Sequence, residues 1–186
     1  MLRWLRRRTI APSALLAVPV TDRDHSQGSL SAPVTLVEYG DYQCPFAGMA
    51  HEVVKRLQES LGDDLRFVYR HFPVPSKHPQ AFGAAQAAEA AASQGKFWEY
   101  HDLLYNDQRS LRLNDLLWHA RNLGLDEAAF HRDLEDARGR QRVEEDKQGG
   151  MSSGVTGTPT FFVNGRGYGG VVEFRDMYEA LLGEIR

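Results

Sequence analysis

The chain has 186 residues, of which 22 are Lys or Arg and 25 are Asp or Glu, and its formal net charge is -3. This length suits one domain whose core needs neither a metal nor a disulfide to stabilise it. The single cysteine excludes an intrachain disulfide framework and any multi-cysteine zinc or iron–sulfur site, and the slightly acidic balance argues against a dedicated nucleic-acid-binding protein.

The N-terminal segment is basic at first and then apolar. Four arginines lie within the first eight residues, and an apolar run at 10–20, broken by two prolines, follows them. This is the order of a signal peptide, but the polar residues at 21–24 make a poor cleavage site. We therefore expect residues 1–29 to be a solvated tail and lead-in of a cytoplasmic protein, with export as the alternative. No stretch approaches the roughly 18 apolar residues of a membrane span.

The next part of the chain predicts a strand, a helix and a second strand. Residues 34–39 are apolar and β-branched, as in a buried strand. Pro45 suits the first position of a helix, apolar residues recur at helical spacing over 49–61, and Gly62 marks the end. Residues 65–69 are the second strand. This βαβ order predicts parallel pairing of the two strands.

A mostly helical stretch follows at about 78–153. Its predicted helices are 81–92, which is rich in alanine, then 97–105, 113–123, 126–134 and 141–152. The chain then returns to strand at 160–163, and Asn164-Gly165 is a strong hairpin signal before a partner strand at 166–168. Apolar residues at steps of three and four predict a closing helix over 173–185.

The single cysteine, Cys44, lies at the predicted strand-to-helix turn, directly before Pro45. A thiol there faces the unpaired N–H groups and the positive dipole end of the helix, and both favour the nucleophilic thiolate. A lone cysteine is also commonly a small buried apolar residue. From the residues alone, a nucleophile and a core residue are both open.

A second feature, 157–160, joins a polar turn to the apolar strand. Pro159 interrupts ladder pairing and so suits the beginning of a strand. Because most X-Pro bonds are trans, the residues alone favour a trans peptide bond before Pro159.

Several segments in this order resemble the DsbA-like branch of the thioredoxin superfamily. They are Asp24-His25, 32–46 (APVTLVEYGDYQCPF), 70–73 (RHFP), 94–98 (QGKFW) and 157–165 (GTPTFFVNG). The resemblance covers roughly residues 25–185. It implies an α/β, thioredoxin-like fold over 30–186, with a helical insertion between the βαβ half and the ββα half, and an enzyme of thiol–disulfide exchange.

The resemblance also implies roles for individual residues. Cys44 matches the nucleophile that forms a mixed disulfide with the substrate. Glu38 matches a buried acid beneath the site; from the residues alone it is a strand carboxylate that faces either side. The residues matched to substrate contact are Pro45 and Phe46, which lie inside the motif, Thr158, whose backbone pairs with the substrate, and Pro159, the cis-proline beside the cysteine.

The chain departs from the family pattern at Ala47. The family motif is C-x-x-C, whereas residues 44–47 here read C-P-F-A. A dithiol enzyme resolves its mixed disulfide with the second cysteine, and this chain has none. Three explanations follow: a natural monothiol enzyme resolved by glutathione or another thiol, an engineered Cys-to-Ala variant of a dithiol enzyme, or a domain that binds partners without redox cycling.

The expected partners are protein disulfides or glutathione, with no nucleic acid and no stable membrane span. We expect no cofactor, although glutathione would serve as a co-substrate. The seven histidines show no metal-ligand spacing, so no metal site is expected. The rival functions are a glutathione-dependent kappa-class-like transferase or isomerase, and a non-catalytic peptide-binding or regulatory thioredoxin-like domain.

Overall fold

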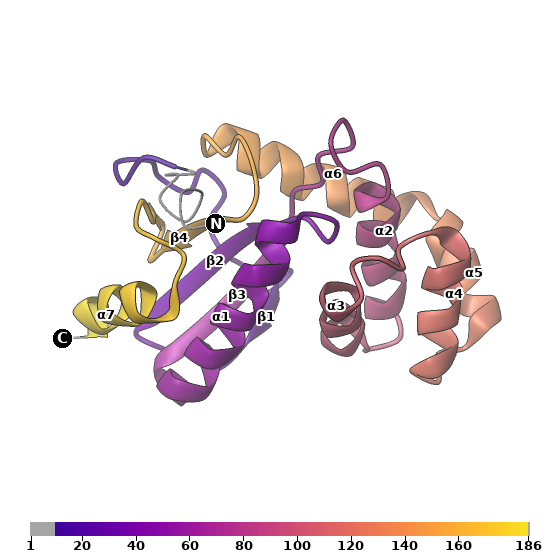
Figure 1. Cartoon of the computed structure of the whole chain (residues 1–186), viewed down its shortest axis with the longest axis horizontal. Coiled ribbons are helices and arrows are strands. Elements are labelled where there is room, and N and C mark those ends of the chain that lie inside the picture. Colours follow the sequence, from indigo (N-terminus) through magenta and orange to yellow (C-terminus); the bar gives the residue numbers. More distant parts are fainter. Residues whose placement is uncertain (1–9, 186) are drawn as a thin grey trace.

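The computed structural model describes residues 10–185, which build a five-stranded sheet of order β1-β3-β2-β4-β5 (Figure 1). The strands are β1 (His25–Gln27), β2 (Val34–Gly40), β3 (Leu65–His71), β4 (Thr160–Val163) and β5 (Arg166–Gly167). The pair β2–β3 is parallel, as the βαβ order predicts, and the other pairs are antiparallel. The central strand β2 therefore lies between a parallel neighbour, β3, and an antiparallel neighbour, β4.

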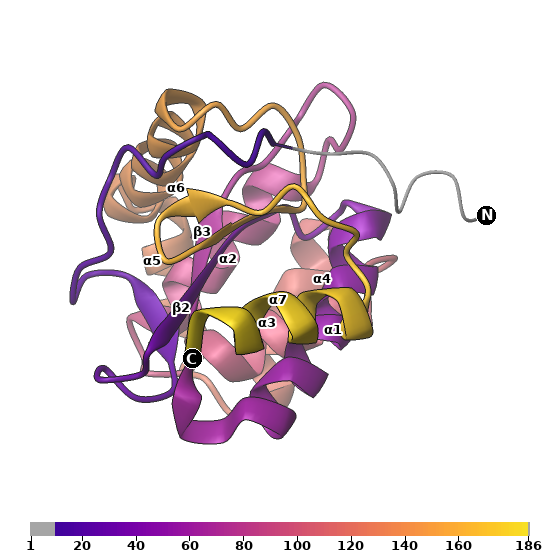
Figure 2. The same ribbon diagram turned by 90° about the vertical axis from the view of Figure 1, so that its left-hand side faces the viewer.

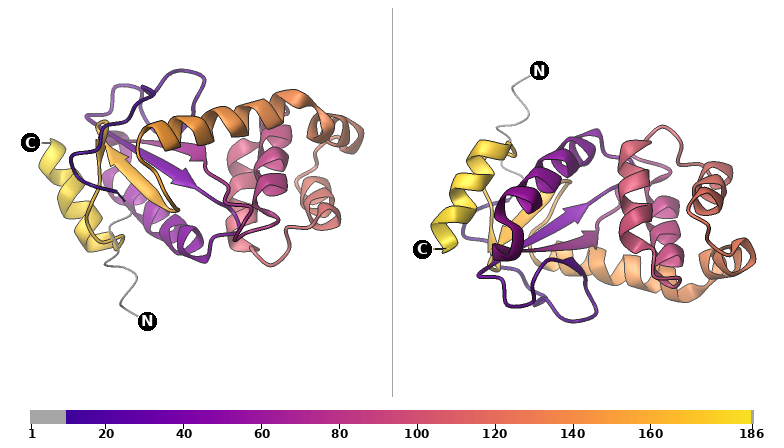
Figure 3. Two further views of the ribbon diagram at one scale, coloured as in Figure 1. Left: turned by 90° about the horizontal axis from the view of Figure 1, so that it is seen from above. Right: turned by 90° about the horizontal axis from the view of Figure 1, so that it is seen from below.

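Some helices cover the sheet, and others form a group at one end of it. They are α1 (Pro45–Leu61), which a short 3-10 turn η1 (Gly62–Asp64) follows, α2 (Ala81–Ala92), α3 (Phe97–Asn106), α4 (Leu113–Asn122), α5 (Glu127–Glu135), α6 (Ala137–Ser152) and α7 (Phe174–Ile185). Helices α1 and α7 lie on one face, while α2 to α5 gather at the end of the sheet away from α7 (Figures 1 and 3). Helix α6 leads from that group back to the sheet (Figure 3). This is the predicted α/β fold with its helical insertion.

The central strand β2 is buried on both faces, which explains why its sequence is almost continuously apolar. Leu36 belongs to the cluster beneath α1 and α7. Val37 and Tyr39 point the other way, into a second cluster that also contains Ile10 and Phe162. Side chains on both faces of β2 are therefore shielded from water.

Most element boundaries agree with the prediction to within one or two residues. Helix α6 begins four residues before the predicted 141, because Asp136 caps it by accepting a hydrogen bond from the backbone N of Arg138 at 2.7 Å. The hairpin signal is also confirmed, since Asn164 and Gly165 have φ values of 47° and 79°.

The segment expected to be a solvated tail is packed against the sheet where the structure describes it. Ile10 is buried in the second cluster, and the backbone N of Leu16 donates to the carbonyl of Gly165 at 2.9 Å (Figure 2). The backbone N of Gly167 donates to Ala14 at 2.9 Å. The arginine-rich first eight residues lie outside the described part.

Strand β1 is a further element that the polar lead-in did not predict. It is held in place by a buried ion pair, in which Arg70 Nε lies 2.8 Å from Asp24 Oδ1 and both side chains are almost fully buried. The same guanidinium donates to the carbonyls of Val18 and Pro19 at 2.8 and 3.0 Å. Arg70 of β3 thus holds the segment that leads into β1.

Within residues 10–185, none of the helices combines the length and apolarity that a membrane crossing requires.

Candidate active site

Cys44 lies where β2 ends and α1 begins. It is the N-cap residue of α1, with extended backbone angles, and Pro45 takes the first helical position. Its side chain is 3% exposed. The thiol Sγ donates to the carbonyl oxygen of Thr158, 114 positions away, at 3.3 Å. The fold therefore brings the cysteine turn and the 157–160 turn together.

The peptide bond between Thr158 and Pro159 is cis. This is the form that the family resemblance implies, and the trans form favoured by the residues alone is wrong. Pro159 is buried, while Thr158 is partly exposed. The carbonyl oxygen of Thr158 accepts the hydrogen bond from the Cys44 thiol.

The two positions inside the motif face solvent, and the fourth does not. Pro45 is exposed, and the side chain of Phe46 is 40% exposed. Ala47 is fully buried in the cluster that also contains Cys44. The methyl group of Ala47 cannot form a disulfide, so Cys44 supplies the one thiol of the described site.

Glu38 lies on β2 and faces the cluster beneath α1. It is opposite Tyr69 of β3 and Phe161 of β4 in the sheet register. The side chain is 1% exposed, and its Oε1 has no hydrogen-bond partner among the described residues. Burial raises the pKa of Glu38 from 4.5 to about 8, because a carboxylate loses its hydration there. Glu38 is therefore mostly a neutral acid at pH 7.

A group of buried aromatic and imidazole side chains lies beside this turn, and the sequence did not predict it. The hydroxyl of Tyr42 is 3.0 Å from His101 Nδ1, and the hydroxyls of Tyr69 and Tyr105 are 3.0 Å apart. Burial raises the pKa of each tyrosine and lowers that of His101, so all four stay neutral at pH 7. They come from three segments, namely the turn before α1, strand β3 and helix α3, so only His101 and Tyr105 are close in the sequence.

Asp41 also holds the turn, and its role was not predicted. Its carboxylate accepts hydrogen bonds from the backbone N of Gln43 at 2.8 Å and from that of Val74 at 2.9 Å. His78 Nδ1 lies 2.8 Å from the same carboxylate. The loop after β3 is thereby tied to the loop that carries Cys44.

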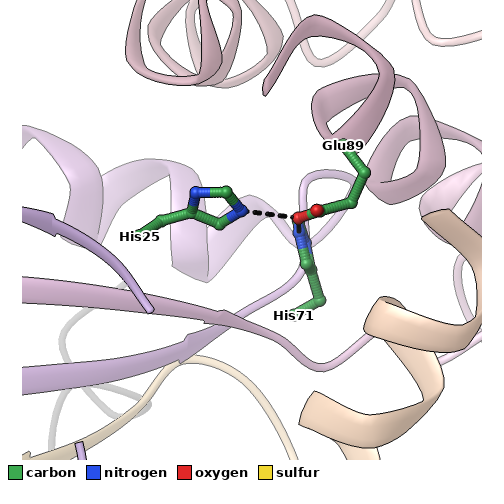
Figure 4. Close-up of side chains that lie close together, drawn as sticks. All are labelled: His25, His71 and Glu89. Atoms are coloured by element: carbon green, nitrogen blue, oxygen red, sulfur yellow. Dashed lines mark hydrogen bonds and ion pairs between the residues drawn. The ribbon is translucent and has the colours of Figure 1, made fainter. Parts of the chain in front are cut away.

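Two histidines and a glutamate meet between the sheet and the helical insertion (Figure 4). His25 Nε2 and His71 Nε2 lie 2.7 and 2.8 Å from the same oxygen, Oε1 of Glu89. Burial alone would raise the pKa of Glu89, but these two hydrogen bonds hold it well below its usual range. The carboxylate is therefore ionised and joins β1 and β3 to α2.

These atoms are of the types that bind zinc. A metal on both Nε2 atoms would leave the proton of each neutral ring on Nδ1. The Nδ1 of His71 is buried and has no partner within the described chain, so that proton would be unpaired. With the hydrogens on both Nε2 atoms, each is paired with Glu89, and only the Nδ1 lone pair of His71 is left without a partner among the described residues. A second such group consists of His51, His101 and Asp102, in which His51 Nε2 lies 3.5 Å from Asp102 Oδ1.

The fold described above, with a cysteine beside a cis-proline, is thioredoxin-like. Residues 20–182 match the family described as Thioredoxin, and the chain belongs to that family. Solved structures, including those of DsbA-type proteins, have the same fold, as the resemblance to the DsbA-like branch implies. BdbD from Bacillus subtilis superimposes with a TM-score of 0.82, at 22% identity, over 93% of this chain and 98% of that one.

Two further structures are similar. A thioredoxin-like oxidoreductase from Silicibacter pomeroyi gives a TM-score of 0.79 at 28% identity, over 89% of this chain and 94% of the other. The α-DsbA1 protein of Wolbachia pipientis gives 0.74 at 20% identity, over 92% and 98%. The likeness to α-DsbA1, like that to BdbD, concerns the fold alone.

Curated relatives by sequence are much longer proteins. A Na(+)/H(+) antiporter, NhaA 1 of Salinispora arenicola, is 51% identical over 156 residues, which are 83% of this chain and 24% of that protein. NhaA 3 of Salinispora tropica is 47% identical over 168 residues, or 90% of this chain and 26% of that protein. The chain spans about a quarter of the length of these relatives.

Proposed function

We propose that the protein catalyses thiol–disulfide exchange on protein disulfides or glutathione mixed disulfides, with Cys44 as its single nucleophile. The observation that carries the proposal is the position of the Cys44 thiol. Cys44 is the N-cap residue of α1 and its thiol contacts the Thr158 carbonyl beside the cis-proline, while Ala47 occupies the position of a resolving cysteine.

The reaction begins when the Cys44 thiol loses its proton. The thiolate attacks one sulfur of the substrate disulfide, so that a new S–S bond forms and the old one breaks. The leaving sulfur departs as a thiolate and takes up a proton from water. Cys44 is oxidised to the mixed disulfide, and the departing thiol is reduced.

The second step needs a thiol from outside the chain, because Ala47 supplies none. Glutathione or a similar small thiol, as its thiolate, attacks the mixed disulfide and releases the Cys44 thiolate. The electrons come from that small thiol, which leaves in a disulfide with the former substrate group or as its own disulfide after a further exchange. Such thiols are abundant in the cytoplasm, so we propose that the reaction takes place there.

The neighbouring residues support substrate binding in this proposal. Loss of the Cys44 proton frees the Thr158 carbonyl to accept a backbone N–H of an extended substrate chain. Pro45 and Phe46 offer an apolar surface beside it. Glu38, neutral at pH 7, adds no negative charge beneath the thiolate.

The test uses a glutathionylated peptide and the intact protein, with and without added glutathione. Cys44→Ser should abolish exchange, whereas Met49→Ser, an exposed position on the same helix, should retain it. Without added thiol, the unaltered protein should stop after one equivalent and carry the adduct mass on Cys44. Exchange that survives in Cys44→Ser would refute the proposal.

A second candidate is a regulatory, non-catalytic domain that acts with a sodium–proton antiporter. The relatives that are named as antiporters favour it, because they contain a stretch 38–51% identical to this chain. This candidate requires that Cys44→Ser leave binding to such a transporter unchanged. If that binding is lost along with exchange, the thiol is part of the interaction.

A further inference from the structure

A side chain of the helical insertion holds the turn that carries Cys44. Gln108 lies between α3 and α4, and its Nε2 is 2.8 Å from the carbonyl oxygen of Tyr42 and 2.9 Å from that of Cys44. A side-chain amide has two N–H donors. One amide group therefore satisfies two carbonyls on either side of Gln43.

The Cys44 carbonyl is also where helix α1 begins. It accepts the first helical hydrogen bond, from the backbone N of Gly48 at 3.1 Å. Gln108 thus bonds to the peptide group that links Cys44 to Pro45. The orientation of this group sets how the cysteine lies relative to the free N–H groups at the start of α1. A group that fixes this peptide also fixes the Cα–Cβ bond of Cys44, from which Sγ extends.

Gly48 leaves the space in which this amide lies. A Cβ built on Gly48 would be 2.3 Å from Oε1 of Gln108 and 2.7 Å from its Cδ. Glycine inside a helix costs about 1 kcal/mol relative to alanine, so its presence in the first turn of α1 calls for a reason. The close approach of Gln108 supplies that reason. Because Gln108 ends in a flexible amide, a methyl group at position 48 would displace it and leave the helix intact.

We infer that Gln108 is a positioning residue for Cys44, through which the helical insertion orients the thiol for exchange. The inference rests on the proposed function, but its first test measures the reactivity of the Cys44 thiol itself. Alkylation of Cys44 by iodoacetamide needs no substrate. A failure of the exchange proposal is therefore distinguishable from a failure of this inference.

The experiment compares Gln108→Ala, Gly48→Ala and the double variant in the intact protein. Each single change should shift the midpoint of the alkylation pH profile upward and slow exchange by about tenfold, the effect of one or two lost hydrogen bonds. In the double variant the two effects should not add, because both changes remove the same contact. Gly48→Ala should at the same time keep or raise the melting temperature, because alanine favours the helix.

Two further variants separate positioning from space filling. Gln108→Glu has nearly the same shape but presents carboxylate oxygens in place of the N–H donors, so it should behave like Gln108→Ala. Gln94→Ala removes another glutamine that bonds to a backbone carbonyl in the helical insertion and should leave Cys44 unchanged. The inference is overturned if Gln108→Ala alters neither the profile nor the exchange rate. It is also overturned if Gly48→Ala acts as strongly without Gln108 as with it.

Discussion

Replacement of Glu38 by glutamine should stabilise the protein, and the gain should grow with pH. Glutamine keeps the size of the buried acid, but it cannot ionise. Glu38 has a raised pKa of about 8 in the folded protein because its carboxyl is 1% exposed and lies among apolar and aromatic side chains. In the unfolded chain the same carboxyl returns to water and ionises near 4.5.

The sign and size of the effect follow from proton binding. Between pH 4.5 and about 8 the folded state binds more protons at Glu38 than the unfolded state, so the free energy of unfolding falls as pH rises. The slope is about 1.4 kcal/mol per pH unit. The loss is absent below the unfolded pKa, reaches about 3 kcal/mol at pH 7 and ends near 5 kcal/mol above the folded pKa.

The assay is urea unfolding of the unaltered protein and Glu38→Gln at pH 5, 6, 7 and 8. The difference in unfolding free energy should increase by about 1.4 kcal/mol at each step up to the folded pKa. Glu52→Gln, which changes an exposed carboxylate on α1, is the control and should show no such trend. A Glu38→Gln difference that is constant over this range would refute the argument, because it would mean that the buried acid is already ionised.

Two other substitutions test the site and the lead-in. Ala47→Cys should let the oxidised protein lose the mass of two hydrogens and exchange without added thiol; two free thiols after treatment with oxidised glutathione would contradict this. Asp24→Ala leaves the 3%-exposed Arg70 without its carboxylate and should lower the urea-unfolding free energy by about 3–5 kcal/mol. A loss below about 1 kcal/mol would show that this pair contributes no more than an exposed one.

Local patterns predicted most of the fold. The helix after Cys44 follows from Pro45, apolar spacing and Gly62, and the hairpin from two residues that accept positive φ. Strand β1 and the packing of residues 10–20 were not predictable, because they depend on Arg70, which lies far along the chain. A polar segment does not reveal which distant side chain will bind it.

The site was predictable only through the family resemblance. Spacing alone gave no reason to place Cys44 beside Thr158, or to choose the face of the sheet for Glu38, since β2 is buried on both sides. The contact of Asp41 with Val74 and that of Gln108 with Tyr42 have no local signal, because a polar side chain bonds to whatever backbone the tertiary structure brings near.

Both edges of the sheet are protected against pairing with another chain. Strand β1 has three residues and β5 has two, and Leu15 of the N-terminal segment pairs with Arg166 on the outer side of β5. Short or covered edges deny an incoming strand a row of free backbone groups. Residues 10–19, which lie ahead of the family match, therefore help to cover this edge of the sheet. The described part of the domain thus offers no long strand edge for self-association.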